Sequence, residues 1–183
     1  MTPAAPRALI AEDEPLLAAA LQQELRTAWP ELQIAATVGD GLSAVQQALA
    51  LQPDVLFFDI RMPGQTGLDA AVALADAWPA HQPFPALVFV TAYDQYAVQA
   101  FEAQAVDYLL KPVQSARLQK TVQKLRLALI HKAQAATNSI ANQSTVALAP
   151  AHTEAHTQAL EPSLQRTVDQ LRHLLAQPGL WPG

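Results

Sequence analysis

The chain has 183 residues, of which 51% are hydrophobic and none is cysteine, and its formal net charge is −5. This length suits one ordinary domain of roughly 100–150 residues plus an appendage, and the apolar content excludes a chain disordered throughout. The composition also excludes disulfides and thiol chemistry, offers no basic patch for nucleic acid, and, without a membrane span or secretory signal, favours the cytoplasm and no membrane contact.

Short β-like runs alternate five times with helix-period segments between Arg7 and Ile130, a pattern typical of βαβ units. We expect strands at Ala8–Ala11, Leu32–Val38, Val55–Phe58, Ala86–Val90 and Val106–Leu109. We expect helices at Pro15–Ala28, Leu42–Leu51, Leu68–Trp78, Gln95–Ala103 and Ser115–Ile130. Several strands are apolar at consecutive residues, as parallel strands covered on both faces are. The sequence therefore predicts an α/β fold with a doubly wound parallel sheet.

The part of the chain after His131 has a different composition. Residues 132–161 are rich in Ala, Gln, Thr, Asn and Ser, which predicts a linker. Residues 162–177 carry Leu164, Val168, Leu171 and Leu175 at helical spacing, which predicts a short linker or dimerisation helix before a tail at 178–183. An isolated helix of this length is marginal in water. We therefore expect it to dock on the folded domain of its own chain or of a partner.

Acidic residues follow two of the predicted strands. Glu12 and Asp13 come directly after the first strand, and Asp59 directly after the third. If the strand order is 2-1-3-4-5, these strands flank the switch point where ligands bind in open sheets. Crowded carboxylates need a cation, and Mg²⁺ commonly joins one or two carboxylates to a phosphate. The alternative is that acidic residues at a helix start merely favour the helix dipole.

A hydroxyl and an ammonium belong to the same predicted edge. Thr91 ends the fourth strand and Lys111 the fifth, so both join the carboxylates as parts suited to phosphoryl transfer. Each alone has a structural explanation, a helix cap for Thr91 and a solvated cation for Lys111. We also hypothesise a cis bond before Pro112 that aims the ammonium inward, and a turn at residues 62–64 beyond Asp59.

The segments AEDEPLL, FFDIRMPG, VTAYD and DYLLKPV together resemble the response-regulator receiver domains of the CheY-like superfamily, in this order across about residues 7–130. The segment AFEAQAVDYLLKPV is similar in sequence to the corresponding segment of the LytTR-type (LytR/AlgR) subgroup. The resemblance places a receiver domain at residues 7–131 of a two-component system. It implies a five-stranded sheet of order 2-1-3-4-5 with five flanking helices.

The resemblance also implies roles for individual residues. Asp59 would be the phosphoacceptor for a partner histidine kinase, with Lys111 and Thr91 contacting the phosphoryl group. Mg²⁺, or Mn²⁺, would be held by Asp13, Asp59 and the main-chain carbonyl of Arg61, with Glu12 reaching it through water.

Thr91 and Tyr108 would act as switch residues that change the face formed by the fourth helix, fifth strand and fifth helix. Tyr108 has the alternative of a plain core aromatic. Such a domain is a phosphoacceptor and not a turnover enzyme.

One departure from the subgroup concerns the output. Its members carry a DNA-binding domain of around a hundred residues, whereas 52 residues follow His131 here. We therefore expect either a fragment of a longer protein or signalling through a homodimer or another protein. No nucleic acid is expected to bind this chain itself.

Two other functions compete with the receiver. A haloacid-dehalogenase-like phosphatase needs a second Asp two places after the nucleophile, where this chain has Arg61. A pseudo-receiver would act as an interaction module without taking phosphate. His152 and His156 stand four apart as zinc ligands can, but without a third ligand nearby we assign them no role.

Overall fold

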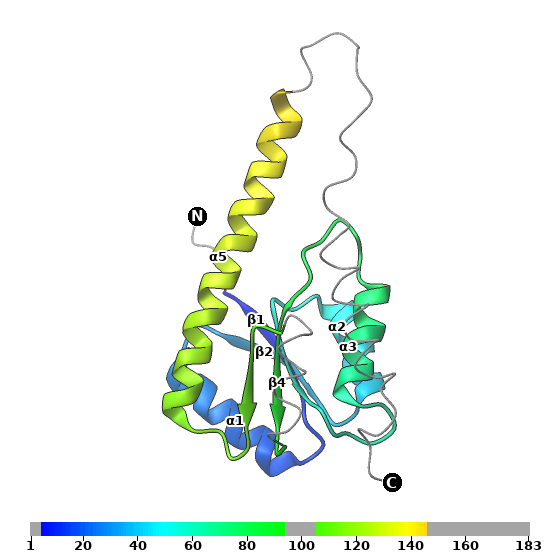
Figure 1. The fold of residues 1–183 in the computed structure, drawn as a ribbon, viewed down its shortest axis with the longest axis vertical. Coiled ribbons are helices and arrows are strands. Elements are labelled where there is room, and N and C mark those ends of the chain that lie inside the picture. The colour runs from blue at the N-terminus through cyan, green and yellow to red at the C-terminus, as the bar shows by residue number, and fades with distance from the viewer. Residues whose placement is uncertain (1–4, 94–104, 146–183) are drawn as a thin grey trace.

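The computed structural model describes residues 5–93 and 105–145, with side chains as far as Thr137. All neighbouring strands of its five-stranded sheet are parallel and follow the order β2-β1-β3-β4-β5 (Figure 1). The strands are β1 (Arg7–Ala11), β2 (Gln33–Val38), β3 (Val55–Asp59), β4 (Ala86–Thr91) and β5 (Asp107–Leu110). The predicted fold class and strand order are therefore confirmed.

The described helices are α1 (Pro15–Ala28), α2 (Gly41–Leu51), α3 (Gly67–Ala77) and α5 (Ser115–Thr145). They match four of the five predicted helices, with shifts of a residue or so at most ends. The predicted helix at Gln95–Ala103 lies outside the described residues, as do the segments at 162–177 and 178–183. Within the described ranges, no helix combines the length and the apolar character needed to span a bilayer.

The sheet is covered on both faces, because alternate residues of each central strand point to opposite sides. Leu56 and Phe58 of β3 belong to a core shared with α2 and α3, whereas Val55 and Phe57 belong to a core shared with α1 and α5. Figure 1 shows the α1 and α5 pair on one side of the sheet and the α2 and α3 pair on the other. This arrangement explains why the strand sequences are continuously apolar.

Local signals start three of the helices. Pro15 occupies the first turn of α1, where its missing N–H has no intrahelical partner. The Asp40 carboxylate accepts from Ser43 N at 2.7 Å to cap α2, and this bond holds the pKa of Asp40 below its usual range. The Thr66 hydroxyl accepts from Asp69 N at 3.1 Å to cap α3. These caps place the starts of α2 and α3 at the edge of the sheet where the strands end.

The length of α5 differs from the prediction. The helix continues through Thr145 instead of ending at Ile130, so residues 132–145 of the predicted linker are helical. Ala and Gln are good helix formers, and neither Gly nor Pro occurs from residue 113 until Pro150. A polar, low-hydrophobicity composition predicts a linker, but the helix propensity of these residues is high and they continue the helix. In Figure 1 this half of α5 projects past the sheet.

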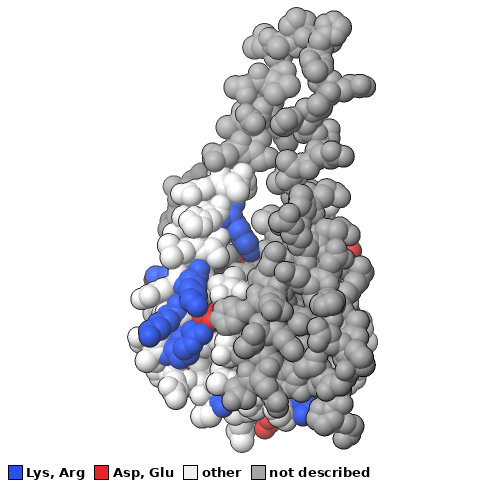
Figure 2. Space-filling model, viewed as in Figure 1, with Lys and Arg blue, Asp and Glu red and all other residues white. Residues whose placement is uncertain are grey.

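A buried carboxylate connects β5 to α5. Asp107 accepts from Arg117 at 2.6 and 2.7 Å and from the Thr121 hydroxyl at 2.9 Å, and pairs with Lys124 at 3.1 Å. Burial opposes ionisation of this group, but the bonds from Arg117, Lys124 and Thr121 outweigh it and lower the pKa of Asp107 to about 2. Figure 2 shows Lys and Arg side chains gathered on this side of the molecule.

Candidate functional site

Three carboxylates converge at the carboxyl ends of β1 and β3, which are adjacent strands. One ligand oxygen from each of Glu12, Asp13 and Asp59 lies within 4.8 Å of the others. Glu12 and Asp59 are buried, whereas Asp13 is exposed to solvent. The predicted convergence is confirmed, and the set is one of oxygen donors that suits a hard divalent cation. Part of the set faces solvent, as a site that keeps bound waters requires.

Lys111 lies directly after β5 and reaches across to both buried carboxylates. Its Nζ is 2.7 Å from Glu12 Oε2 and 2.7 Å from Asp59 Oδ2. The ammonium is itself mostly buried, so these two bonds supply its charge compensation. The peptide bond between Lys111 and Pro112 is cis, as hypothesised from the sequence. The structure thus brings together a cation and the acidic cluster that lie far apart in the chain.

The pKa values in this cluster reflect competition between burial and charge. Burial raises the pKa of Glu12, and the neighbouring Asp59 adds to this, although Lys111 works in the opposite direction. Burial alone would lower the pKa of Lys111, but the bonds to Asp59 and Glu12 outweigh it and raise this pKa. The ammonium therefore stays charged while it contacts Asp59.

Arg61 contributes its main chain and its side chain differently. The Arg61 N–H donates to Asp59 Oδ1 at 3.2 Å, which orients the carboxylate. The guanidinium donates to the Tyr93 hydroxyl at 2.9 Å and lies 5.0 Å from the centre of that ring. The contact joins the loop after β3 to the loop after β4 beside the acidic cluster.

Thr91 and Tyr108, the two predicted switch residues, lie on the adjacent strands β4 and β5. Thr91 is fully buried at the end of β4, and its hydroxyl accepts from Tyr93 N at 3.2 Å. Its carbonyl accepts from Lys111 N at 2.9 Å, which ties the end of β5 to the end of β4. Tyr108 is half-buried and packs against the core shared with α2 and α3.

Gly67 is a site residue that sequence reasoning missed. A Cβ atom added to it would lie 1.9 Å from the carbonyl oxygen of Asp59, so only glycine fits at the start of α3. Gly64, three residues earlier, has φ of +74° in the predicted turn, where the left-handed backbone favours glycine. The pair of glycines so soon after Asp59 was the available signal for close packing here.

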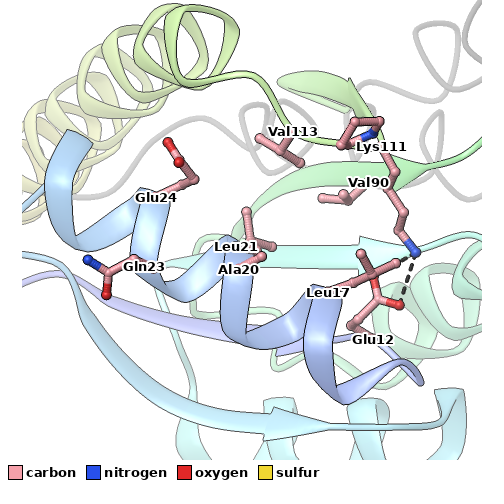
Figure 3. A pocket seen from close by; sticks show the side chains of 10 residues that line it. Glu12, Leu17, Ala20, Leu21, Gln23, Glu24, Val90, Lys111 and Val113 are labelled. Atoms are coloured by element: carbon pink, nitrogen blue, oxygen red, sulfur yellow. Dashed lines mark hydrogen bonds and ion pairs between the residues drawn. The ribbon is translucent and has the colours of Figure 1, made fainter.

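A groove of about 300 Å³ runs from the acidic cluster along α1. Figure 3 shows Lys111 and Glu12 at one end of it and Glu24 at the other. Leu17, Ala20, Leu21 and Val113 give its sides an apolar lining. The groove therefore offers an apolar approach to the charged site from α1 and the loop before α5.

Comparison with known families identifies the domain. Residues 8–123 match the model of the response regulator receiver domain. Over 123 residues the chain is 47% identical to an uncharacterized response regulatory protein of Vibrio cholerae, covering 67% of this chain and 45% of that protein. Over 123 residues it is also 45% identical to the transcriptional regulatory protein BtsR of Escherichia coli, covering 66% of this chain and 48% of that protein. The chain thus spans about half the length of these curated relatives.

Solved structures agree with this match. The response regulatory domain of mrkE from Klebsiella pneumoniae superposes with a TM-score of 0.58 at 35% identity, covering 67% of this chain and 96% of that one. The receiver domain of AraT from Geobacillus stearothermophilus gives a TM-score of 0.62 at 30% identity, covering 69% and 97%. By sequence, fold and the clustering of its acidic residues with Lys111, the chain belongs to the response regulator receiver domain family.

Proposed function

We propose that this receiver domain is switched by phosphorylation of Asp59, with a histidine kinase as its partner. The observation that carries the proposal is the 2.7 Å contact between Lys111 Nζ and Asp59 Oδ2 at a sheet edge crowded with carboxylates. A cation held against one carboxylate oxygen is placed to neutralise phosphoryl oxygens as they arrive. Thr91, on the neighbouring strand, supplies a hydroxyl at the same edge.

The donor set fits Mg²⁺, or Mn²⁺, because three carboxylates from two adjacent strands approach within 4.8 Å of one another. Asp13, Asp59 and the main-chain carbonyl of Arg61 would hold the ion, and Glu12 would reach it through water. The bound ion would supply charge neutralisation for the incoming phosphoryl group.

The chain's own residues carry the transfer itself. A carboxylate oxygen of Asp59 attacks the phosphorus of a phosphohistidine, the new O–P bond forms, and the P–N bond breaks with its electrons returning to the imidazole of the kinase. The Arg61 N–H, 3.2 Å from Asp59 Oδ1, fixes the orientation of the attacking group. Lys111 stays charged throughout, and its ammonium exchanges the contact with the Asp59 carboxylate for contacts with the phosphoryl oxygens.

The phosphoryl group then changes which contacts Thr91 can make. At present the Thr91 hydroxyl accepts from Tyr93 N, and its own proton can be donated to a phosphoryl oxygen. We propose that this new contact draws the loop after β4 toward Asp59 and moves Tyr108, which changes the surface beside β5 and α5. A ligand contact made in only one state shifts the population toward that state.

The longer relatives are the basis for proposing an output for this switch. Relatives named as transcriptional regulators are about twice the length of the matched region. We propose that the domain controls homodimerisation and a LytTR-type DNA-binding domain outside this chain, and that the chain itself contacts neither DNA nor membrane. The domain works as a cytoplasmic phosphoacceptor and not as a turnover enzyme, since the position of the phosphatase general acid is occupied by Arg61.

The test is phosphorylation with a small donor. Wild-type chain incubated with acetyl phosphate or phosphoramidate and Mg²⁺ should gain one phosphoryl group by intact mass, and Asp59→Asn should gain none. Asp54→Asn is the matched control, because Asp54 lies at the opposite end of β3 and should leave labelling unchanged. An unlabelled wild type, or equal labelling of Asp59→Asn, contradicts the proposal. Continuous release of phosphate from many equivalents of an ester would instead indicate a phosphatase.

A further inference from the structure

A second cavity lies where β3 and β4 begin, at the end of the sheet opposite the acidic cluster. It has a volume of about 260 Å³, is partly open to solvent, and is lined by the loop before β3, the loop before β4 and α5. Trp78, Pro83 and Phe84 give it an aromatic and apolar wall, and α5 closes it with Leu129 and Lys132. None of these groups takes part in the proposed phosphoryl transfer.

Lys132 differs from the other lysines of the chain in its surroundings. Its ammonium donates to the main-chain oxygen of Phe84, a neutral acceptor. The chain has four lysines, all within the described residues. Lys111 contacts two carboxylates, Lys124 pairs with Asp107 at 3.1 Å, and Lys120 is exposed on the surface of α5. Lys132 is thus the one of the four lysines that lines a cavity and bonds a neutral acceptor instead of a carboxylate.

The charges around Lys132 can be named element by element. Among the residues lining the cavity, Asp54, before β3, is the other charged side chain, and its Oδ2 already accepts from Arg7 N at 2.8 Å. The lining residues of the loop before β4 are uncharged, as are those of α5 other than Lys132 itself. Burial lowers the pKa of Lys132 to about 8, against a smaller opposing effect of Asp54. A neutral amine is a nucleophile, whereas a protonated one is not.

We propose that Lys132 is an acyl-acceptor site that reacts with small acyl donors of the acyl phosphate class. The amine attacks the carbonyl carbon, an N–C bond forms, the C–O bond to phosphate breaks, and the amine loses a proton to solvent. The products are an amide and free phosphate. The cavity of about 260 Å³ has room for a short acyl chain beside Phe84.

The location gives the modification a consequence for α5. The Lys132 ammonium donates to Phe84, which lies two positions before the start of β4, and so connects α5 to the loop before that strand. Acylation would remove the positive charge and add bulk between the helix and Phe84. The projecting half of α5 would then be held differently relative to the sheet, independently of Asp59.

The experiment is a competition among the four lysines of one chain. The full chain is treated with acetyl phosphate, digested with a protease that does not cut at lysine, and the acetylated fraction of each lysine is followed by mass spectrometry across pH. Lys132 should acetylate on the order of tenfold faster than Lys120 near neutral pH, because a larger share of its amine is unprotonated. Its rate should level off near the pKa of about 8, far below the rise of an exposed lysine.

Three controls make the result decisive. Acetylation in urea should remove the advantage of Lys132, since the cavity is lost on unfolding. Asp54→Asn should move the Lys132 profile to lower pH, because the favourable charge is gone. Hydroxylamine treatment separates the stable amide from any acyl phosphate formed on Asp59.

Equal rates for Lys132 and Lys120 in the folded chain would overturn the proposal. So would a Lys132 profile that rises at the same pH as that of Lys120. Lys132→Arg keeps the positive charge and should lose only the label at this position, so persistence of the label on that peptide would equally contradict it.

Discussion

At the residue scale, Gly67 shows how one missing side chain sets the position of Asp59. The Gly67 N–H donates to Ile60 O at 2.9 Å, and the site for a Cβ atom lies 1.9 Å from Asp59 O. The start of α3 therefore packs directly on the backbone of the proposed phosphoacceptor. Any larger residue must push β3 and α3 apart at this point.

We expect Gly67→Ala to lower the unfolding free energy by about 1–3 kcal/mol and to slow phosphorylation of Asp59. Gly64→Ala is the matched control in the same loop, because it meets nothing within 4 Å and changes only the cost of a positive φ. It should cost about 1–2 kcal/mol and leave the labelling rate close to wild type. Urea unfolding and intact-mass labelling measure both effects. Equal labelling rates for Gly67→Ala and wild type would show that the contact does not position Asp59.

Asp107 is the residue whose ionisation should contribute most visibly to stability. Its pKa is lowered from 3.8 to about 2. The stability that its ionised form contributes is therefore fully present above pH 3.8 and is lost as the pH falls through about 2. The shift corresponds to about 2 kcal/mol at neutral pH. Asp107→Asn should lose about 2–3 kcal/mol at neutral pH, and its deficit relative to wild type should shrink as the wild-type carboxylate becomes protonated.

Urea unfolding across this pH range measures the Asp107 effect. Glu31→Gln serves as the control. Glu31, before β2, pairs at the surface with Arg126 of α5, and 63% of the Glu31 side chain and 46% of the Arg126 side chain are exposed. An exposed pair contributes about 0–1 kcal/mol, so this variant should differ little from wild type at any pH. A deficit for Asp107→Asn that stays constant down to acid pH would contradict the linkage.

At the element scale, α5 consists of two halves with different environments. Leu118, Val122 and Leu125 are buried against the sheet, whereas the described residues from Ala133 to Thr137 are exposed. The first half gains stability from packing, and the second half depends on helix propensity and on continuity with the first. Exposed Leu127 and Ile130 lie between these two regions.

We expect substitutions in the two halves of α5 to separate helix content from stability. Ala135→Pro should reduce helical circular dichroism, because proline clashes with the preceding turn, while the urea midpoint of the domain changes little. Leu125→Ala should instead cost about 2–5 kcal/mol with little loss of helix in the folded state. A large drop in midpoint for Ala135→Pro would mean that the projecting half supports the core.

At the scale of the whole molecule, α5 connects the end of the sheet where the strands terminate with the end where they begin. It starts four residues after Lys111 and runs along the sheet (Figure 1). Its Lys132 donates to the main-chain oxygen of Phe84, which precedes β4. Both cores and all residues of the candidate site lie between Ala8 and Leu129. A displacement of β5 or its following loop can therefore be transmitted to the projecting half of α5.

Of the two docking options for the helix predicted at 162–177, we expect the partner and not its own domain, so the chain shortened to residues 1–145 should fold and accept phosphate as the full chain does. Its unfolding free energy should agree within about 1 kcal/mol, because it retains every described core residue. The rate of Asp59 labelling by acetyl phosphate should also be unchanged. A less stable or slower shortened chain would show that residues 146–183 dock on the domain.

Sequence pattern determined the sheet and the chemistry of the site because both depend on local information. The apolar runs and the residues that directly follow them place Glu12, Asp59, Thr91 and Lys111 at one edge, and the observed strand order agrees. The predicted helix boundary at Ile130 is wrong because residues 132–145 are polar but have a high helix propensity. The metal and phosphoryl roles stay predictions until labelling is measured.

Only the tertiary structure decided which groups touch. Lys111 reaches Glu12 across 99 positions and Asp59 across 52, and no periodicity in the sequence specifies such a contact. The same holds for Gly67 against the Asp59 carbonyl, Asp107 between Arg117 and Lys124, and Lys132 against Phe84. Residue patterns report the period of an element, whereas these contacts arise from how the packed elements fill space.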